Sequence, residues 1–469
     1  MQWRRLRRLE DGTLVSTIEA SPHDAASAYA AVTRYQWDDF RPMVYATHDA
    51  GVTWKDISGG LPDGDFTRVI REDPKRKGLL YLGTETGVFV SFDGGASWDS
   101  LRGNLPAVPV YDLAIKDDDL IAATHGRSFW VLDDLTVLHQ SGETVEASDV
   151  HLFQPRDTYR PLTAMSRDLG MSSRPGRAAT PGINYHRVSG ETVAFYNRRT
   201  EAGTTQRVYL DAGENAPTGL VVNYYLRDMA QGEIGLEFLA DDDTILAVFS
   251  QTGADGITLP ANAGMNQFVW DLSYADRDGH LPSAPPLIPP GSYKVRLKVG
   301  GSVMERAFTL LKDPRLASTS EDLGEQSALI LKIRSKLVET SDFLQNVREI
   351  GRQVADWTNR AQTLPGGESV VDAARDVLSR LDSVERVVTK DHLPNKVNLP
   401  PACLDEKLAQ LTYAVATSGG KPTSQSYQVL DDVAERIDEQ IGVFRQIQEN
   451  EIKAFLSLIQ DLDVPLITS

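Results

Sequence analysis

The chain has 469 residues, of which 41% are hydrophobic and 24% charged, a composition typical of folded globular proteins. This length exceeds that of one ordinary core, so the sequence predicts two to four domains. The formal net charge of −18 repels phosphate backbones and anionic lipid, which argues against nucleic acid or a membrane surface as the main partner.

Cysteine usage and apolar runs leave the compartment open. Cys403 is the only cysteine, so no disulfide can form within one chain. The arginines of residues 4–8 are not followed by an apolar run, and the sequence therefore predicts no signal peptide in this chain. No segment approaches the ~20 apolar residues of a membrane span. These features fit a cytoplasmic protein as well as an exported one.

A repeated motif occupies the N-terminal part of the chain. Residues 47–54 (THDAGVTW) and 91–98 (SFDGGASW) share the pattern Ser/Thr-x-Asp-x-Gly-x-Ser/Thr-Trp, and their aspartates are 44 residues apart. This period is that of a four-stranded propeller blade. The pattern predicts a tight hairpin in which Asp accepts turn N–H bonds, Gly adopts a positive φ and Trp packs between sheets. We assign this structural role to Asp49, Gly51, Trp54, Asp93, Gly95 and Trp98.

A third unit follows without the motif. It contains three β-rich runs, Val110–Ala114, Leu120–Ala123 and Phe129–Leu132, and predicts a blade that lacks its outer strand. Residues 1–4 look like the end of a preceding motif, so we expect further blades upstream. Three blades alone would leave an open ring with uncovered sheet edges, because a propeller needs roughly four or more blades to close.

The two motifs, with the runs Val69–Pro74 and Ala123–Trp130, resemble large bacterial proteins with BNR (Asp-box) repeats, which are sortilin-like (VPS10) and labelled glycosyl hydrolases. Those proteins are longer, and this chain resembles their C-terminal portion. The resemblance implies a β-propeller in a secreted or periplasmic protein. It also implies that missing upstream blades, or another chain, complete the ring.

In the rest of the chain, composition and apolar periodicity change twice. Residues Arg160–Gly182 form a Pro-, Gly- and Arg-rich stretch without apolar periodicity. Alternating runs between Leu220 and Leu311 predict a β-sandwich, which resembles the immunoglobulin-like domain of flagellar-hook-capping type in that family. Apolar residues at helical spacing follow, and Ser318 with Glu321 has the spacing of a capping box. They predict an antiparallel helical bundle.

The predicted fold class is therefore multidomain, mainly β and then α. We expect a partial β-propeller of about three Asp-box blades at residues 1–140 and a connector with irregular and β segments at 141–217. An immunoglobulin-like β-sandwich is expected at 218–312, and the antiparallel helical bundle at 313–469.

In a propeller, the loops from second to third strands and from one blade to the next line one face of the channel. On that face we expect the ligand-binding residues Arg34, Trp37, Arg41, Asp65, Arg68, His125 and Arg127. Carboxylates there accept sugar hydroxyls or act as acid and base, while rings stack on apolar faces. The candidate catalytic residues are Asp38, Asp39 and Glu85; ion pairing alone would explain the same residues equally well. No metal-ligand spacing or cofactor motif occurs, so we predict no metal and no cofactor.

Two functions compete for this face. The first is a non-catalytic module, part of a larger sortilin-like protein, that binds a glycan or a peptide. The alternative is a glycoside hydrolase acting on polysaccharide, with Asp38 or Asp39 and Glu85 as its carboxylate pair. A third possibility is that any activity resides in the upstream blades. We favour binding, because it makes looser geometric demands than catalysis.

Overall fold

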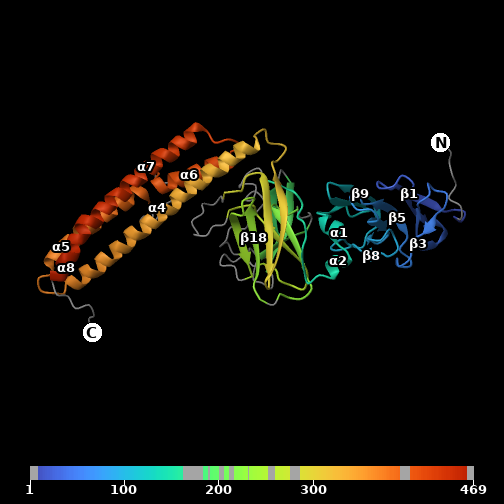
Figure 1. Ribbon diagram of the computed structural model, residues 1–469, viewed down its shortest axis with the longest axis horizontal. Coiled ribbons are helices and arrows are strands. Elements are labelled where there is room, and N and C mark those ends of the chain that lie inside the picture. The colour runs from blue at the N-terminus through green and yellow to red at the C-terminus, as the bar shows by residue number, and fades with distance from the viewer. Residues whose placement is uncertain are drawn as a thin grey trace.

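The structure is a computed structural model that describes residues 9–161, 183–188, 191–199, 205–210, 216–230, 232–251, 259–274, 286–390 and 402–461. Figure 1 shows an elongated molecule with small sheets at one end, larger sheets in the middle and long helices at the other end. The predicted order of mainly β and then α is confirmed. Most of the Pro-, Gly- and Arg-rich stretch lies outside the described residues. None of the described helices has the length and apolar character needed to cross a membrane.

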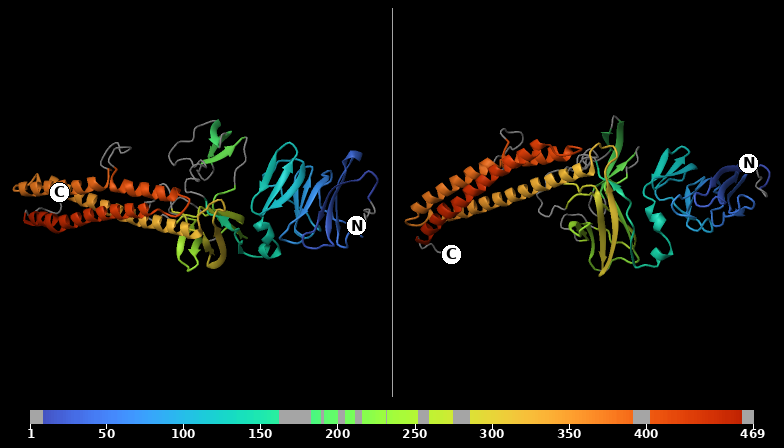
Figure 2. Two further views of the ribbon diagram at one scale, coloured as in Figure 1. Left: turned by 90° about the horizontal axis from the view of Figure 1, so that it is seen from above. Right: turned by 45° about the horizontal axis from the view of Figure 1, so that its top comes forward.

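Three small sheets follow one another along the chain, and each is an antiparallel meander in sequence order. The first consists of β1 (Leu14–Ala20), β2 (Ala28–Arg34), β3 (Asp39–Thr47) and β4 (Lys55–Asp56). The second consists of β5 (Thr67–Glu72), β6 (Leu80–Thr84), β7 (Val88–Ser91) and β8 (Asp99–Ser100). The third consists of β9 (Val110–Lys116), β10 (Asp119–Thr124) and β11 (Phe129–Leu132). Figure 2 shows the three lying face to face, and we call them the sheet stack.

The repeated motif forms the turn between the two outer strands of the first and second sheets. In the second sheet, the Asp93 carboxylate accepts bonds from the Ser97 N–H (2.9 Å) and the Ser97 hydroxyl (2.6 Å), and Gly95 has a φ of 91°. The matching bonds from Thr53 lower the pKa of Asp49 to about 2. Both motif aspartates therefore hold their own turns together.

Apolar side chains fill the spaces between the sheets. Trp98 is buried between the first and second sheets, where its indole Nε1 donates to the carbonyl oxygen of Ile57 (2.8 Å). Val88 and Leu113 belong to a second buried cluster, which lies between the second and third sheets. Burying each large apolar side chain stabilises the fold by about 1.5–3 kcal/mol. The stack is therefore held mainly by packing between sheets.

Two larger sheets share one core in the middle of the chain. One contains β12 (Val150–Leu152), β17 (Leu220–Leu226) and β20 (Gly264–Trp270). The other contains β13 (Thr158–Tyr159), β22 (Ser302–Leu311), β21 (Gly291–Val299), β18 (Ile234–Ala240) and β19 (Ile245–Ser250). In this core Phe238 stacks on Trp270 with ring centroids 4.2 Å apart. The two facing sheets confirm that the alternating runs in this region are strands.

Shorter elements connect the sheet stack to these two sheets. Helices α1 (Thr136–Gln140) and α2 (Glu143–Glu146) follow β11. A separate three-stranded sheet, β14 (Ile183–Val188), β15 (Glu191–Arg199) and β16 (Thr205–Tyr209), precedes β17 in the chain. The region predicted as an irregular and β connector therefore contains both helical turns and strands.

The C-terminal helices bury a common apolar core. They are α4 (Ser320–Ala361), α5 (Glu368–Val388), α6 (Leu404–Thr417), α7 (Ser424–Ile447) and α8 (Lys453–Asp461), with the π-helical turn Gln448–Ile452 between the last two. The capping box predicted at Ser318 and Glu321 is wrong by one residue. The Thr319 hydroxyl accepts the Asp322 N–H (3.1 Å), and the Asp322 carboxylate accepts the Thr319 N–H (2.9 Å). The Ser318 hydroxyl donates instead to the carbonyl oxygen of Gly419.

A buried arginine joins the larger sheets to the bundle. Arg160 donates from Nε to the Ile288 carbonyl oxygen (3.0 Å) and from Nη2 to the amide oxygen of Gln326 in α4 (3.0 Å). The Gln326 amide in turn donates to the Val415 carbonyl oxygen of α6 (2.9 Å). Burial lowers the pKa of Arg160 to about 10. One hydrogen-bond network therefore spans a sheet edge and two helices.

Candidate functional site

The first strands of the three stacked sheets, β1, β5 and β9, each carry a β-bulge at the same relative place. The bulged residues are Ser16, Arg68 and Tyr111, and β5 contacts both of its neighbours. A bulge bends its strand and re-aims the extra side chain away from the regular alternation. These three corresponding positions build the centre of the candidate site.

Arg68 has the most contacts of the three. Its guanidinium carbon lies 4.1 Å from the ring centroid of Tyr111 and 4.9 Å from that of Phe66. Its Nε and Nη2 lie 2.7 and 2.5 Å from the same Glu85 carboxylate oxygen. Ring faces attract a cation electrostatically, so the two rings and the carboxylate hold the guanidinium in one place. The side chains of Arg68 and Glu85 are 15% and 33% exposed, and a ligand can reach the pair.

Two aromatic stacks widen this centre. Tyr35 stacks on Phe66 with centroids 4.9 Å apart, and His125 stacks on Tyr111 with centroids 5.0 Å apart. Tyr35 belongs to the short 3-10 helix η1 (Tyr35–Trp37) between β2 and β3, and His125 lies between β10 and β11. Loops of all three sheets therefore meet here. We call the following residues the arginine cluster: Tyr35, Phe66, Arg68, Glu85, Tyr111 and His125.

Asp39 belongs to a second polar group at the start of β3. Its carboxylate accepts bonds from Arg41 Nε (2.9 Å) and Arg41 Nη2 (2.7 Å), and Arg34 Nε lies 3.9 Å away. The bonds from Arg41 lower the pKa of Asp39 to about 2. Arg34 also pairs with Glu10. A carboxyl with this pKa is ionised at neutral pH, so it is poorly suited to donate a proton there.

Two predicted acidic residues shape loops. The buried Asp65 carboxylate accepts bonds from the hydroxyls of Thr84 (2.9 Å) and Thr86 (2.7 Å), which fixes the loop between β6 and β7. Asp38 has a φ of 55° at the end of η1, a left-handed conformation that Asp tolerates better than most residues. Asp65 and Asp38 therefore each have a structural role in a loop.

Trp37 and Arg127 lie at the solvent side of these loops. Trp37 is 64% exposed, and a Cβ added at Gly12 would come within 2.4 Å of its indole nitrogen. Arg127 is exposed between β10 and β11, and its carbonyl oxygen accepts a bond from the Trp130 indole (2.9 Å). Trp37 and Arg127 therefore add an exposed ring and an exposed cation to this end of the stack.

Among the predicted residues, the structure brings Arg68, Glu85 and His125 together, while Asp39, Arg34 and Arg41 form their own group. Phe66 and Tyr111 were not among the predicted site residues. Phe66 lies just before β5 and Arg68 is the bulged residue of that strand, so the regular alternation of a strand could not have indicated their contact. Tyr111 carried no signal either, because a bulge sets its direction.

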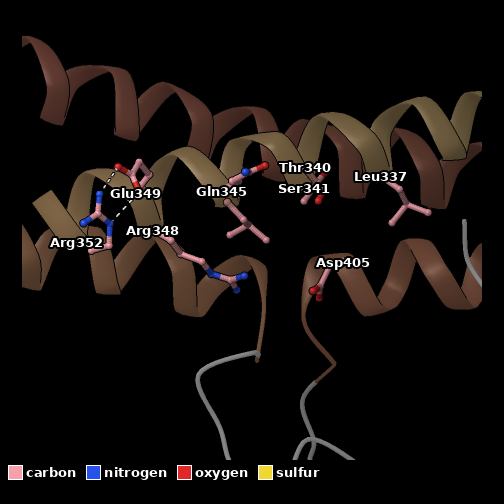
Figure 3. A pocket seen from close by; sticks show the side chains of 9 residues that line it. Leu337, Thr340, Ser341, Gln345, Arg348, Glu349, Arg352 and Asp405 are labelled. Carbon is pink, nitrogen blue, oxygen red and sulfur yellow. Dashed lines mark hydrogen bonds and ion pairs between the residues drawn. The ribbon is translucent and has the colours of Figure 1, made fainter. Parts of the chain in front are cut away.

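A hollow of about 620 Å³ adjoins the Asp39 group, with Arg34, Arg41, Met43 and Tyr45 among its lining residues. Another hollow, of about 710 Å³, lies along α4 in the bundle and is shown in Figure 3. Charged side chains that line it form ion pairs: Arg352 bonds Glu349, and Arg348 bonds Glu385. Nowhere in the described ranges do three or more His, Cys, Asp or Glu side chains gather into a possible metal site.

Comparisons with known proteins show limited similarity. No family model matches this chain, and no curated protein matches it. The chain is similar to a GH74 enzyme from Niastella koreensis at 12% identity and a TM-score of 0.22, over 64% of this chain and 46% of that one. It is similar to the GH74 xyloglucanase from Xanthomonas campestris at 14% identity and a TM-score of 0.20, over 67% and 40%.

A further similarity is to YCF48 bound to D1 peptide, at 12% identity and a TM-score of 0.22, over 65% of this chain and 82% of that one. The chain spans less than half of the two GH74 enzymes. Similarities of this size carry no argument about activity, and the function has to be argued from the residues themselves.

Proposed function

We propose that the sheet stack forms three blades of an Asp-box β-propeller and binds a glycan or a peptide at the arginine cluster. The observation that carries this proposal is the Arg68 guanidinium, held between the rings of Phe66 and Tyr111 and against Glu85. Rings pack on the apolar faces of sugars or side chains, and a fixed cation and carboxylate bind polar groups. The exposed Trp37 extends this surface.

The second candidate is a glycoside hydrolase acting on polysaccharide. It is favoured by two carboxylates, Asp39 at the start of β3 and Glu85 in the loop between β6 and β7. A glycosidase needs one carboxyl whose pKa is raised, so that it can act as general acid. The pKa of Asp39 is lowered instead, and Glu85 is paired with Arg68. These ion pairs favour binding over hydrolysis.

The wider assignment rests on the motifs. We infer a BNR-repeat, sortilin-like protein that is secreted or periplasmic, in which additional blades or another chain complete the propeller. The stacked four-stranded sheets with motif turns at Asp49 and Asp93 support this assignment. The two facing sheets around Trp270 correspond to the immunoglobulin-like domain of this proposal.

A binding survey combined with a cleavage assay tests the proposed function. The intact chain is applied to glycan and peptide arrays, and every glycan that binds is then incubated with the protein in a reducing-sugar release assay. The proposal expects binding without release. The Glu85→Gln variant is assayed in parallel, because it removes the charge while keeping the shape.

The outcomes separate the two candidates. Sugar release that Glu85→Gln abolishes, with an unchanged circular-dichroism spectrum, would replace the binding proposal by hydrolysis. Failure to bind any ligand on either array would refute both candidates for the ligands tested.

A further inference from the structure

The loops around the arginine cluster carry a charge opposite to that of the whole chain. The loops 84–87, 101–109 and 124–128 contain one carboxylate, Glu85, against two arginines, Arg102 and Arg127. Arg68 of the adjacent strand β5 adds a third arginine. The formal net charge of the chain is −18, so this local excess of cations runs against the rest of the sequence. It favours an anionic ligand at this end of the stack.

Two of these arginines have no carboxylate partner in the described part of the chain. Arg102 and Arg127 are both exposed. The Arg102 Nε bonds a carbonyl oxygen of its own loop, that of Leu105 (3.1 Å), and its side chain lies beside Gly87. Arg127 follows His125, a ring of the cluster, by two residues. Two exposed cations therefore flank the arginine cluster, and Arg102 was not among the predicted site residues.

Arg68 keeps one donor nitrogen for a ligand. The rings of Tyr111 and Phe66 lie 4.1 and 4.9 Å from its guanidinium carbon, and its Nε and Nη2 face Glu85. Within the described residues, Nη1 of Arg68 and Oε1 of Glu85 have no hydrogen-bond partner, and neither atom is buried. A ligand can therefore accept a bond from Nη1 and donate one to Oε1.

A donor and an acceptor side by side, next to a ring, fit a sugar acid. A carboxylate accepts strong, charge-assisted bonds from a guanidinium. A sugar hydroxyl can donate to the Glu85 Oε1, and the apolar face of the sugar can pack on Tyr111, which is 50% exposed. A uronic acid carries all three groups on one ring. Further uronates of the same polymer can then pair with Arg102 and Arg127.

The backbone of these loops offers little to a peptide. Peptides are often captured through main-chain bonds to an open sheet edge. Here the N–H of Glu85 bonds the carbonyl oxygen of Phe66 (3.1 Å), and the N–H of His125 bonds that of Pro109 (2.9 Å). Ring faces and charged side chains remain for the ligand. These groups suit a sugar acid better than a peptide main chain.

We propose that the arginine cluster binds an acidic polysaccharide through its uronate carboxylates, with Arg68 as the central contact and Arg102 and Arg127 as flanking contacts. This inference rests on the proposed function, binding at the arginine cluster, and narrows the ligand to an anionic glycan. The excess of cations in these loops and the open Nη1 of Arg68 carry it.

Matched oligosaccharides test the role of charge. The intact chain is titrated in a calorimeter with oligogalacturonate and with alginate oligosaccharide, each beside its carboxyl-reduced, neutral form. We expect at least one uronate oligosaccharide to bind at least about tenfold more tightly than its neutral form, because reduction removes the charge-assisted bond. The affinity should fall from about 0.05 to about 0.5 M NaCl, because salt screens exposed charges.

Substitutions locate the contact. Arg102→Gln and Arg127→Gln should each weaken binding of that oligosaccharide by about two- to fivefold, as expected for exposed ion pairs. Lys55→Gln, at an exposed cation directly after the first motif turn, is the matched control and should leave the affinity unchanged. Circular dichroism checks that the variants fold.

The outcomes separate this inference from the proposed function. Equal binding of charged and reduced oligosaccharides, tighter binding of polyglutamate, or unchanged affinity in both arginine variants would each overturn the uronate proposal. If a neutral glycan or a peptide binds instead and Arg68→Gln weakens its binding, the proposed function stands and only this inference fails. Absence of binding by every ligand would refute both.

Discussion

At the start of β3, Arg41 bonds both carboxylate oxygens of Asp39, and these bonds lower the pKa of Asp39 to about 2. In Arg41→Gln we expect this pKa to return toward the ordinary value of 3.8, because the bonded cation is lost. The folded-state pKa lies below the unfolded one, so the pair stabilises the fold above about pH 4 and loses this effect as the pH falls toward 2. Carboxyl-carbon NMR titration measures the shift; the pKa of Asp49, lowered by Thr53, is the internal control. An unchanged Asp39 titration would contradict this assignment.

At the same scale, the sequence indicated several polar residues of the candidate site but not their surroundings. Blade topology predicted both Arg68 and Glu85 in loops of one end; Glu85 lies in the loop between β6 and β7, whereas Arg68 is the bulged residue of strand β5. It could not predict that Phe66 and Tyr111 enclose the guanidinium, because the bulges that aim Arg68 and Tyr111 have no signature in the residue order. Nor could it predict that Asp39 is held by its neighbour Arg41.

Among the elements, the motif turn of the second sheet allows a prediction about stability, because its Trp98 packs between two sheets. Trp98 is buried between two sheets, so Trp98→Ala should destabilise the fold by about 3–5 kcal/mol. Trp98→Phe keeps one aromatic ring but loses the rest of the indole and its bond to Ile57, and should cost less than Trp98→Ala. Trp54→Ala is the control with the smaller loss, since Trp54 is only half-buried. Urea unfolding of the three variants measures these differences; equal losses at both tryptophans would contradict the packing described here.

Elements with a long, regular pattern were predicted well. The alternating runs between Leu220 and Leu311 include the strands β17, β18, β20, β21 and β22, and the apolar residues at helical spacing after them lie in helices such as α4. Helix starts were less predictable. Thr319 and Asp322 form the box at the start of α4, while Ser318 bonds Gly419, a residue distant in the sequence. Local spacing contains no information about such a contact.

For the whole molecule, the joint at Arg160 decides how the larger sheets and the bundle hold together. In Gln326→Leu the buried guanidinium loses an acceptor, and we expect a loss of about 3 kcal/mol. Gln353→Leu, on the exposed side of the same helix, should change stability by less than about 0.5 kcal/mol. Calorimetry of both variants tests the joint. A Gln326→Leu protein as stable as the Gln353→Leu control would show that the network does not stabilise the junction.

The sequence predicted that strands come first in the chain and helices follow. It did not predict the contacts between the sheets and the helices. Periodicity changes from two to 3.6 residues after Asp313, and this marks the passage from strands to helices. The joint between Arg160 and Gln326 connects residues far apart in the chain, and neither belongs to a motif. Contacts of this kind depend on how finished elements pack, which residue spacing does not encode.

In the proposed function, the Arg68 guanidinium binds the ligand. Isothermal titration of the strongest array ligand into the unmodified chain and into Arg68→Gln tests this role, with Arg375→Gln, at an exposed arginine of α5, as the matched control. We predict a loss of affinity of at least about tenfold for Arg68→Gln, equivalent to about 1.4 kcal/mol, and none for Arg375→Gln. Equal affinity of the unmodified chain and Arg68→Gln, both folded by circular dichroism, would show that Arg68 does not bind the ligand.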